Sequence, residues 1–257
     1  MRRPPTITAL GTGTSVGVPC IGCSCDACTS DDPRDTRLRT SAAVRFTDAS
    51  GHERCVLIDT SVDLRQQALS HGLTRCDAVL YTHNHTDHVL GLDELRRYNA
   101  MQRTAIPIYA EDRCYRNIAR MFTHVFEPAG NVNASFIAEL TPGIIEDVPR
   151  DGGAARPIDL WGLRVTPIRL LHGRLPILGY RFDLSEGVLS GMDEDERSRS
   201  PFPLAWCTDT SAIPSKTWTH LRGLKTLFID GLRFRKHPTH FTVDHAVDAA
   251  PRIGAAS

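Results

Sequence analysis

Short apolar runs recur along the chain, separated by turn residues and by stretches with helical spacing. We expect these runs to form strands at residues 6–13, 41–47, 54–61, 77–82, 106–110, 163–171, 178–184, 204–210 and 226–230. The turn at 48–53 predicts an antiparallel pair from the second and third runs. Residues 62–73, ending near Gly72 as a C-cap, and residues 91–100 have the spacing of helices. Strands that alternate with helices favour a mixed α/β fold.

Two stretches interrupt this pattern, and we expect them to form loops. Residues 142–157 are broken by proline and glycine, and residues 185–203 carry mixed charges. Because no internal repeat or long linker is apparent, we expect residues 1–257 to form one domain.

Composition limits the classes of function. Apolar residues make up 41% of the chain, and Lys+Arg and Asp+Glu both number 30, so no net charge favours nucleic acid or anionic membrane. No apolar run reaches the roughly 18 residues of a membrane span, and the basic N-terminus lacks the apolar core of a signal peptide. We expect a cytoplasmic enzyme with a small-molecule substrate, for which a homodimer is one option.

The segment YTHNHTDHVLG places His83, His85, Asp87 and His88 within six positions, directly after an apolar run. Imidazole and carboxylate are the usual ligands of zinc, manganese and iron. A strand end followed by a tight turn into a helix would direct all four side chains into one small volume. Four such ligands exceed the three that one catalytic ion usually takes, which indicates two metals. The alternative is a solvated surface turn rich in histidine.

A second cluster, CIGCSCDAC at residues 20–28, contains Cys20, Cys23, Cys25 and Cys28. Four thiols in nine residues predict a structural metal site, with zinc as the expected ion. The spacing is tight, so three cysteines with a distant fourth ligand would also fit, and a loop of unpaired thiols is the alternative. The other four cysteines are scattered in apolar contexts and are expected to be reduced, packed thiols.

Single candidate ligands stand at three further strand ends: Asp59, His172 and Asp209. Their order along the chain is a strand aspartate, the H-x-H-x-D-H turn, a lone histidine and an aspartate in TDT. With GTGTS ahead of it, this order resembles the metallo-β-lactamase superfamily. The resemblance implies a four-layer αβ/βα sandwich with a dinuclear site at the strand ends.

Within that superfamily the chain resembles the phosphoribosyl 1,2-cyclic phosphate phosphodiesterase group that accompanies carbon–phosphorus lyase. The shared motifs are GTGTSVGVP, then Cys23, Cys25 and Cys28, and KHPTHF with His240. The resemblance implies that a hydroxide held between two zinc or manganese ions hydrolyses a small cyclic phosphate ester, and that one further zinc is structural.

The resemblance also assigns roles to individual residues. His83, His85 and His172 would bind one metal, Asp87 and His88 the other, and Asp209 would bridge them. Asp59 would orient the ligand turn through hydrogen bonds. His240 would contact the phosphate and protonate the leaving alkoxide, so that His240 and Asp87 are the expected catalytic residues.

The chain departs from this group at its end, where AAPRIGAAS stands in place of a strand carrying T-H-x-x-H. We therefore expect a C-terminally truncated fold that lacks its last strand, with a weakened second metal site and Cys20 as the only nearby candidate for the fourth zinc ligand. His245 is expected to be a surface residue. Two alternatives remain open: a relative of pyrroloquinoline quinone biosynthesis protein B, and a metal-binding remnant with impaired catalysis. A tRNA 3′-end nuclease is disfavoured because the chain has no basic arm.

Overall fold

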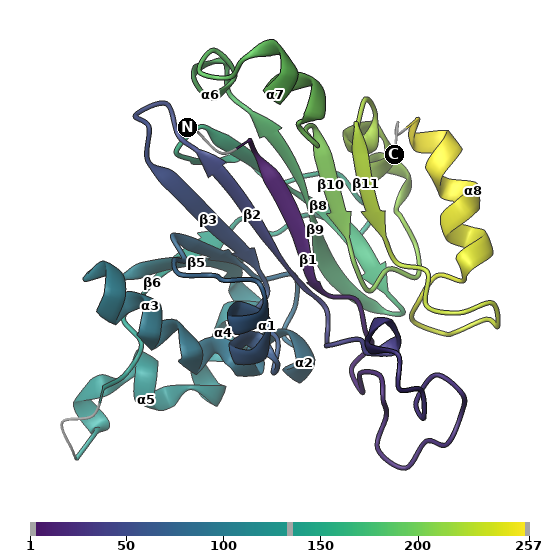
Figure 1. The fold of residues 1–257 in the computed structure, drawn as a ribbon, viewed down its shortest axis with the longest axis horizontal. Helices are drawn as coiled ribbons and strands as arrows, with labels where there is room; N and C mark the ends of the chain where they lie inside the picture. The colour runs from purple at the N-terminus through teal and green to yellow at the C-terminus, as the bar shows by residue number, and fades with distance from the viewer. Residues whose placement is uncertain (1–3, 133–135, 255–257) are drawn as a thin grey trace. The chain divides into compact units, whose positions relative to one another are not determined.

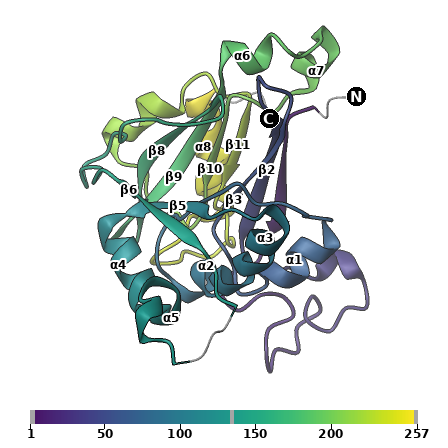
Figure 2. The same ribbon diagram turned by 90° about the vertical axis from the view of Figure 1, so that its left-hand side faces the viewer.

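The computed structural model describes residues 4–132 and 136–254, which belong to two compact units (Figures 1 and 2). The N-terminal unit comprises Ile7–Arg45 and Arg54–Ile144. The C-terminal unit comprises Met1–Thr6, Phe46–Glu53 and Ile145–Ser257. The expectation of one domain over the whole chain stays a prediction.

A six-stranded sheet lies mainly in the N-terminal unit, in the order β1-β2-β3-β4-β5-β6. Its strands are β1 (Thr6–Gly11), β2 (Ser41–Thr47), β3 (Glu53–Ile58), β4 (Ala78–Leu80), β5 (Ile106–Glu111) and β6 (Leu140–Ile145). The pairs β3–β4 and β4–β5 are parallel. Because parallel strands end at the same edge, the residues that follow β3 and β4 emerge side by side. Asp59 and the histidine turn are these residues.

Helices of the same unit pack against that sheet. They are α1 (Leu64–Ser70), α2 (Thr86–Val89), α3 (Leu95–Gln102), α4 (Asp112–Met121) and α5 (Thr123–Phe126). Leu64, Leu95 and Ile118 bring α1, α3 and α4 into one buried cluster with strand residues such as Leu57 and Val79. Each of these five side chains has no exposed surface, so the apolar spacing of the helices accounts for their packing.

The C-terminal unit holds a five-stranded sheet in the order β11-β10-β9-β8-β7. Its strands are β7 (Ile158–Leu160), β8 (Leu163–His172), β9 (Leu175–Leu184), β10 (Leu204–Cys207) and β11 (Thr226–Ile229). Strands β7 to β10 pair antiparallel, and β10 pairs with β11 in parallel. Strands β8, β10 and β11 therefore run in the same direction and end at the same edge of the sheet.

Helix α8 (Val243–Ile253) covers one face of this sheet. Its Ala249 and Ile253 are buried in a cluster with Ile168 and Leu170 of β8 and Cys207 of β10. Thr242 caps the helix: its hydroxyl accepts the N–H of His245, whose own side chain is exposed, as expected of a surface residue. Among the described residues, no helix has the length and apolar character needed to cross a bilayer.

Two expected loops contain regular structure. Residues 140–145 form strand β6, so the loop that we expected at 142–157 begins only after residue 145. The segment 185–203 contains α6 (Glu186–Leu189) and α7 (Glu194–Arg199). Asp193 and Glu196 form a reciprocal capping box at the start of α7, a local signal that the mixed charges of this segment concealed.

Candidate metal centre

The histidine turn of the N-terminal unit follows β4 and continues into α2, whose N-cap is His85. The ring of His83 lies 4.5 Å from that of His85 and 4.2 Å from that of His88, measured between centroids. Oδ2 of Asp87 is 3.5 Å from Nε2 of His88. His83 and His88 are buried, whereas His85 is exposed. Neighbouring side chains of this turn therefore lie close together within the unit, and their role as metal ligands stays a prediction.

Asp59 holds the histidine turn in place through hydrogen bonds. Its Oδ1 accepts the N–H of Thr82 at 2.8 Å, and its Oδ2 accepts the Thr82 hydroxyl at 2.8 Å and lies 2.7 Å from Nδ1 of His88. Burial raises the pKa of the Asp59 carboxyl, and the charge and hydrogen bond of His88 oppose that rise. The backbone of Asp59 has a φ of 60°, a left-handed conformation that aspartate tolerates better than most residues. These contacts fit the orienting role expected of Asp59.

These hydrogen bonds decide which histidine nitrogen can face a metal. Nδ1 of His88 is held by Asp59, and Nδ1 of His83 lies 2.9 Å from the Thr82 hydroxyl. Both bonds leave Nε2 as the nitrogen available for coordination. Histidine ligands usually donate their other ring N–H to a carboxylate or similar acceptor, which fixes the tautomer and raises the basicity of the ligand. The donor set therefore fits a divalent transition metal.

The C-terminal unit carries a second cluster where β8, β10 and β11 end. His172 is the last residue of β8, and its Nδ1 lies 2.7 Å from the carbonyl oxygen of Thr239. Asp209 follows β10 with a φ of 51°. The ring of His240 lies 4.7 Å from that of His172, and its Nδ1 is 3.9 Å from Oδ1 of Asp209. His172, Asp209 and His240 are thus brought together, as the sequence led us to expect.

Asp230 belongs to the same cluster and was not among the expected site residues. Its Oδ2 lies 2.6 Å from Nδ1 of His240, and its backbone N–H donates to the carbonyl of Cys207 at 3.0 Å. Burial raises the pKa of the Asp230 carboxyl, while the hydrogen bond and charge of His240 lower it. The signal was present in the sequence, because Asp230 ends the apolar run TLFID just as Asp59 ends its own run.

The expected site residues therefore fall into two sets, each confined to one unit. His83, His85, Asp87, His88 and Asp59 lie in the N-terminal unit, and His172, Asp209 and His240 lie in the C-terminal unit.

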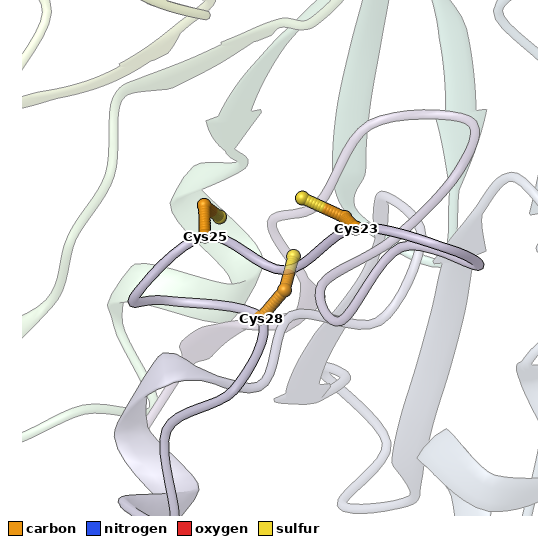
Figure 3. Close-up of side chains that lie close together, drawn as sticks. All are labelled: Cys23, Cys25 and Cys28. Atoms are coloured by element: carbon orange, nitrogen blue, oxygen red, sulfur yellow. The ribbon is translucent and has the colours of Figure 1, made fainter.

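The cysteine loop lies in the N-terminal unit, outside regular strands and helices. The ligand atoms of Cys23, Cys25 and Cys28 all lie within 4.8 Å of one another (Figure 3). Hydrogen bonds lower the pKa of the Cys25 thiol, and the bond from the Cys28 N–H has the largest effect. For Cys28, the N–H of Cys20 lowers the pKa, but the Cys23 thiol, burial and the Cys25 thiol outweigh it, so the pKa is raised. Three thiols this close favour a shared cation, because their thiolates would otherwise repel one another.

Cys20 takes a different place in the loop. Its N–H donates to Sγ of Cys28 at 3.3 Å, and its own Sγ lies 3.8 Å from the carbonyl of Ile21. Among the described residues, the group of three cysteines whose sulfur atoms lie close together does not include Cys20. The remaining cysteines, Cys55, Cys76, Cys114 and Cys207, are buried free thiols, which confirms that expectation.

Comparison with known proteins identifies the family. A model for the beta-lactamase superfamily domain matches residues 54–257. The crystal structure of a diphosphatase from the PhnP family is 36% identical in sequence and has a TM-score of 0.77, covering 98% of this chain and 83% of that one.

Two curated proteins are also similar. An octanoyltransferase of Porphyromonas gingivalis is 37% identical over 248 residues, which are 95% of this chain and 43% of that protein. The coenzyme PQQ synthesis protein B of Methylobacterium nodulans is 35% identical over 96 residues, 34% of this chain and 32% of that protein. The chain thus spans less than half the length of either curated relative. By the family model and the solved relative together, the chain belongs to the metallo-β-lactamase superfamily and lies close to its PhnP family.

Proposed function

We propose that the protein is a metal-dependent hydrolase of small phosphate esters that cleaves a phosphodiester or diphosphate bond. The observation that carries this proposal is the histidine turn, in which Asp59 holds Nδ1 of the buried His88 and so leaves Nε2 for a metal. The diphosphatase of the PhnP family supports the choice of phosphorus as the reacting centre, since that protein is 36% identical over nearly the whole chain. A cyclic phosphate such as phosphoribosyl 1,2-cyclic phosphate is the substrate that we propose.

In the proposed arrangement, His83, His85 and His172 would hold one divalent ion, Asp87 and His88 would hold the other, and Asp209 would serve both. This assignment rests on the order of the residues along the chain and on membership of the superfamily. When bound, two zinc or manganese ions would supply an activated water and would neutralise charge on the phosphoryl oxygens.

The residues of the C-terminal unit would complete the reaction. An alkoxide is a basic leaving group, so its departure is accelerated when a nearby acid protonates it. His240 is suited to this step because Asp230 holds its Nδ1 at 2.6 Å, which leaves Nε2 to carry the transferred proton. His172 is oriented in the same way by the Thr239 carbonyl.

We further propose that Cys23, Cys25 and Cys28 bind a structural zinc ion as thiolates. Their mutual proximity supports this proposal, and a zinc site of this kind would contribute to folding directly. The fourth ligand is not assigned by the described residues.

A relative of PQQ synthesis protein B is the second candidate, favoured by the 35% identity over 96 residues. Octanoyl transfer is not proposed, because the match covers only 43% of that relative and the donor set of this chain is that of a metal site.

One experiment distinguishes these functions. The purified protein, with its metals measured by mass spectrometry, would be offered a five-membered cyclic phosphate, bis(p-nitrophenyl) phosphate, a diphosphate diester and a lactone. We expect metal-dependent turnover of at least one phosphorus ester and none of the lactone. Turnover of the lactone alone would contradict the proposed function.

A further inference from the structure

A polar cleft of about 710 Å³ lies within the C-terminal unit, far from the sheet edge that holds His172. Side chains of β7, β8 and β9 line it, together with residues between 154 and 157 and the end of the 3₁₀ helix η4 (Ser215–Leu221). Arg164, the second residue of β8, lines the cleft, whereas His172 is the last residue of that strand. Eight residues of extended chain place them about 26 Å apart, so the cleft is separate from the candidate metal centre.

Three charged side chains form a row across the strands of the cleft. Asp159 of β7 pairs in register with Arg164 of β8, and Arg164 pairs in register with Asp183 of β9. Directly opposed residues of antiparallel strands point to the same face of the sheet, with Cβ atoms about 5 Å apart. Arg164 therefore stands between two carboxylates, and all three side chains line the cleft.

The carboxylate of Asp183 is already neutralised by Arg181. Its Oδ2 accepts from Nε of Arg181 and its Oδ1 from Nη2, both at 2.9 Å. Nη1 of Arg181 donates to the carbonyls of His220 at 2.9 Å and Arg222 at 2.8 Å, which fixes the pair against the end of η4. Asp183 and Arg181 thus satisfy each other within the protein.

Arg164 and Asp159 differ from that pair, because they face each other in register without forming an ion pair. Among the described residues, the guanidinium of Arg164 takes part in no hydrogen bond or ion pair. Asp159 uses Oδ1 to accept the N–H of Gly162 at 3.2 Å, and its Oδ2 has no partner in the described part of the chain. The cleft therefore offers one unpaired cation and one unpaired carboxylate oxygen side by side.

Thr166 supplies a third unpartnered group. It follows Arg164 by two residues on the same face of β8, lines the cleft and is only 8% exposed. Within the described ranges, its hydroxyl has no hydrogen-bond partner. A buried hydroxyl without a partner is unfavourable, so a ligand group that hydrogen-bonds to it is stabilised.

From this arrangement we propose that the cleft binds a free α-amino acid by its carboxylate and ammonium groups. The carboxylate accepts from the Arg164 guanidinium, which matches its planar geometry, and from the Thr166 hydroxyl. The ammonium donates to Oδ2 of Asp159. A zwitterion fits because the unpaired groups include one of each sign. The two arginines and two aspartates of the lining balance in charge, which disfavours a multiply charged anion.

Calorimetric titration with the common L-amino acids tests this proposal. We expect at least one of them to bind saturably. Its methyl ester lacks the carboxylate charge and its N-acetyl derivative lacks the ammonium charge, and each keeps the side chain. Both derivatives should bind about tenfold more weakly or worse, since each loses one charge-assisted contact.

Two variants assign the contacts to their residues. Arg164→Gln and Asp159→Asn should each weaken binding of the amino acid about tenfold or more. The methyl ester should bind Arg164→Gln as weakly as it binds the wild type, and the N-acetyl derivative should behave in the same way towards Asp159→Asn. Arg252→Gln and Asp244→Asn, both exposed on α8, are the matched controls and should bind as the wild type does.

Thr166→Val separates a binding role from a structural one. It replaces the unpartnered hydroxyl by a methyl group, so the ligand-free variant should unfold at a temperature equal to or higher than that of the wild type, while its affinity for the amino acid falls. A variant that is less stable and binds equally well would contradict the role of Thr166.

The outcomes decide the inference without any measurement of turnover. Absence of binding by every amino acid, or equal binding by the wild type and Arg164→Gln, would overturn it. Equally tight binding of the N-acetyl derivative would also overturn it, because the cleft would then recognise a carboxylate alone, such as the end of a peptide. Failure of the proposed function leaves these binding results unaffected.

Discussion

Nδ1 of His240 lies 2.6 Å from Oδ2 of Asp230, and this contact joins the loop before α8 to the end of β11. The carboxylate requires the Nδ1 proton, so it fixes both the ring orientation and the tautomer of His240. Asp230 is thereby a positioning residue for the proposed proton donor, and it acts on the reaction through His240.

Asp230→Asn should test that role. An amide of the same shape can present its N–H₂ to Nδ1 and so favour the wrong tautomer. We expect kcat for a cyclic phosphate with an alkoxide leaving group to fall about a hundredfold or more, the usual contribution of general acid catalysis. Hydrolysis of bis(p-nitrophenyl) phosphate, whose leaving group needs no proton, should change less than about threefold. Asp244→Asn, an exposed change in α8, is the matched control.

Two results would refute the positioning role of Asp230. An equal loss on both substrates accompanied by lost metal would make Asp230 a ligand. Unchanged rates on both substrates would show that Asp230 takes no part in the reaction.

Asp59→Asn should weaken metal binding at the histidine turn. The variant keeps the shape of the side chain but loses the charge that supports His88, so we expect an affinity about 10–100-fold lower. Calorimetric titration of the metal-free protein with zinc measures the change in affinity. Asp112→Asn, at the half-buried first turn of α4, should bind as the wild type does. Unchanged affinity in Asp59→Asn would show that this carboxylate does not support the site.

The cysteine loop yields a prediction that separates Cys20 from its neighbours. Cys28→Ser should lose one equivalent of zinc and the thiolate charge-transfer bands of the cobalt-substituted protein, since Cys28 lies in the group of three sulfurs. Cys20→Ser should keep both, because Cys20 contributes its backbone N–H to the loop. If Cys20→Ser also lost the bands, Cys20 would be the fourth ligand after all.

The buried thiols should resist alkylation over a wide range of pH. Burial raises the pKa of Cys55 and of Cys207 to about 12, whereas an ordinary thiol ionises near pH 8.5. At pH 9, iodoacetamide should therefore modify the exposed Cys25 of the metal-free protein, whose pKa is lowered, while Cys55 and Cys207 react only after unfolding. Peptide mapping by mass spectrometry provides the measurement, and modification of Cys207 in the native protein would contradict it.

The same shifts predict how stability depends on pH. The unfolded thiols begin to ionise near pH 8.5, but the folded ones stay protonated until about pH 12. The stabilisation that the buried thiols contribute is fully present below pH 8.5. The free energy of unfolding should fall as pH rises from there towards about 12. Urea unfolding at pH 8 and pH 10 measures the difference. The variants Cys55→Ala and Cys207→Ala should flatten the dependence, and an unaltered slope in both would rule out this cause.

Much of the site could be predicted because its residues follow apolar runs. Asp59 comes directly after a strand, Asp209 and the histidine turn come shortly after theirs, and hydrophobic patterning locates strand ends well. Asp230 shares that position, but a lone aspartate is also an ordinary turn residue. Its role depends on His240, ten residues away, and on the hydrogen bonds that fold the intervening loop.

Helices α4 and α7 were not predicted from the sequence, because their charged residues obscure the apolar pattern. Helix α4 buries only Cys114 and Ile118, and its Arg113, Arg116 and Arg120 are exposed, so its apolar signal is short. Helix α7 buries none of its residues and depends on the capping box of Asp193 and Glu196. Local capping chemistry decides such helices, and periodicity alone does not reveal them.

The most direct test of the central claim is the metal content and phosphodiesterase rate of His85→Ala beside the wild type. The His85 side chain is exposed, so its removal should spare the fold, and His71→Ala is a matched change at another exposed histidine. We predict that His85→Ala loses active-site metal and phosphodiesterase activity together, while His71→Ala keeps both. Full metal content and an unchanged rate in His85→Ala would contradict the account.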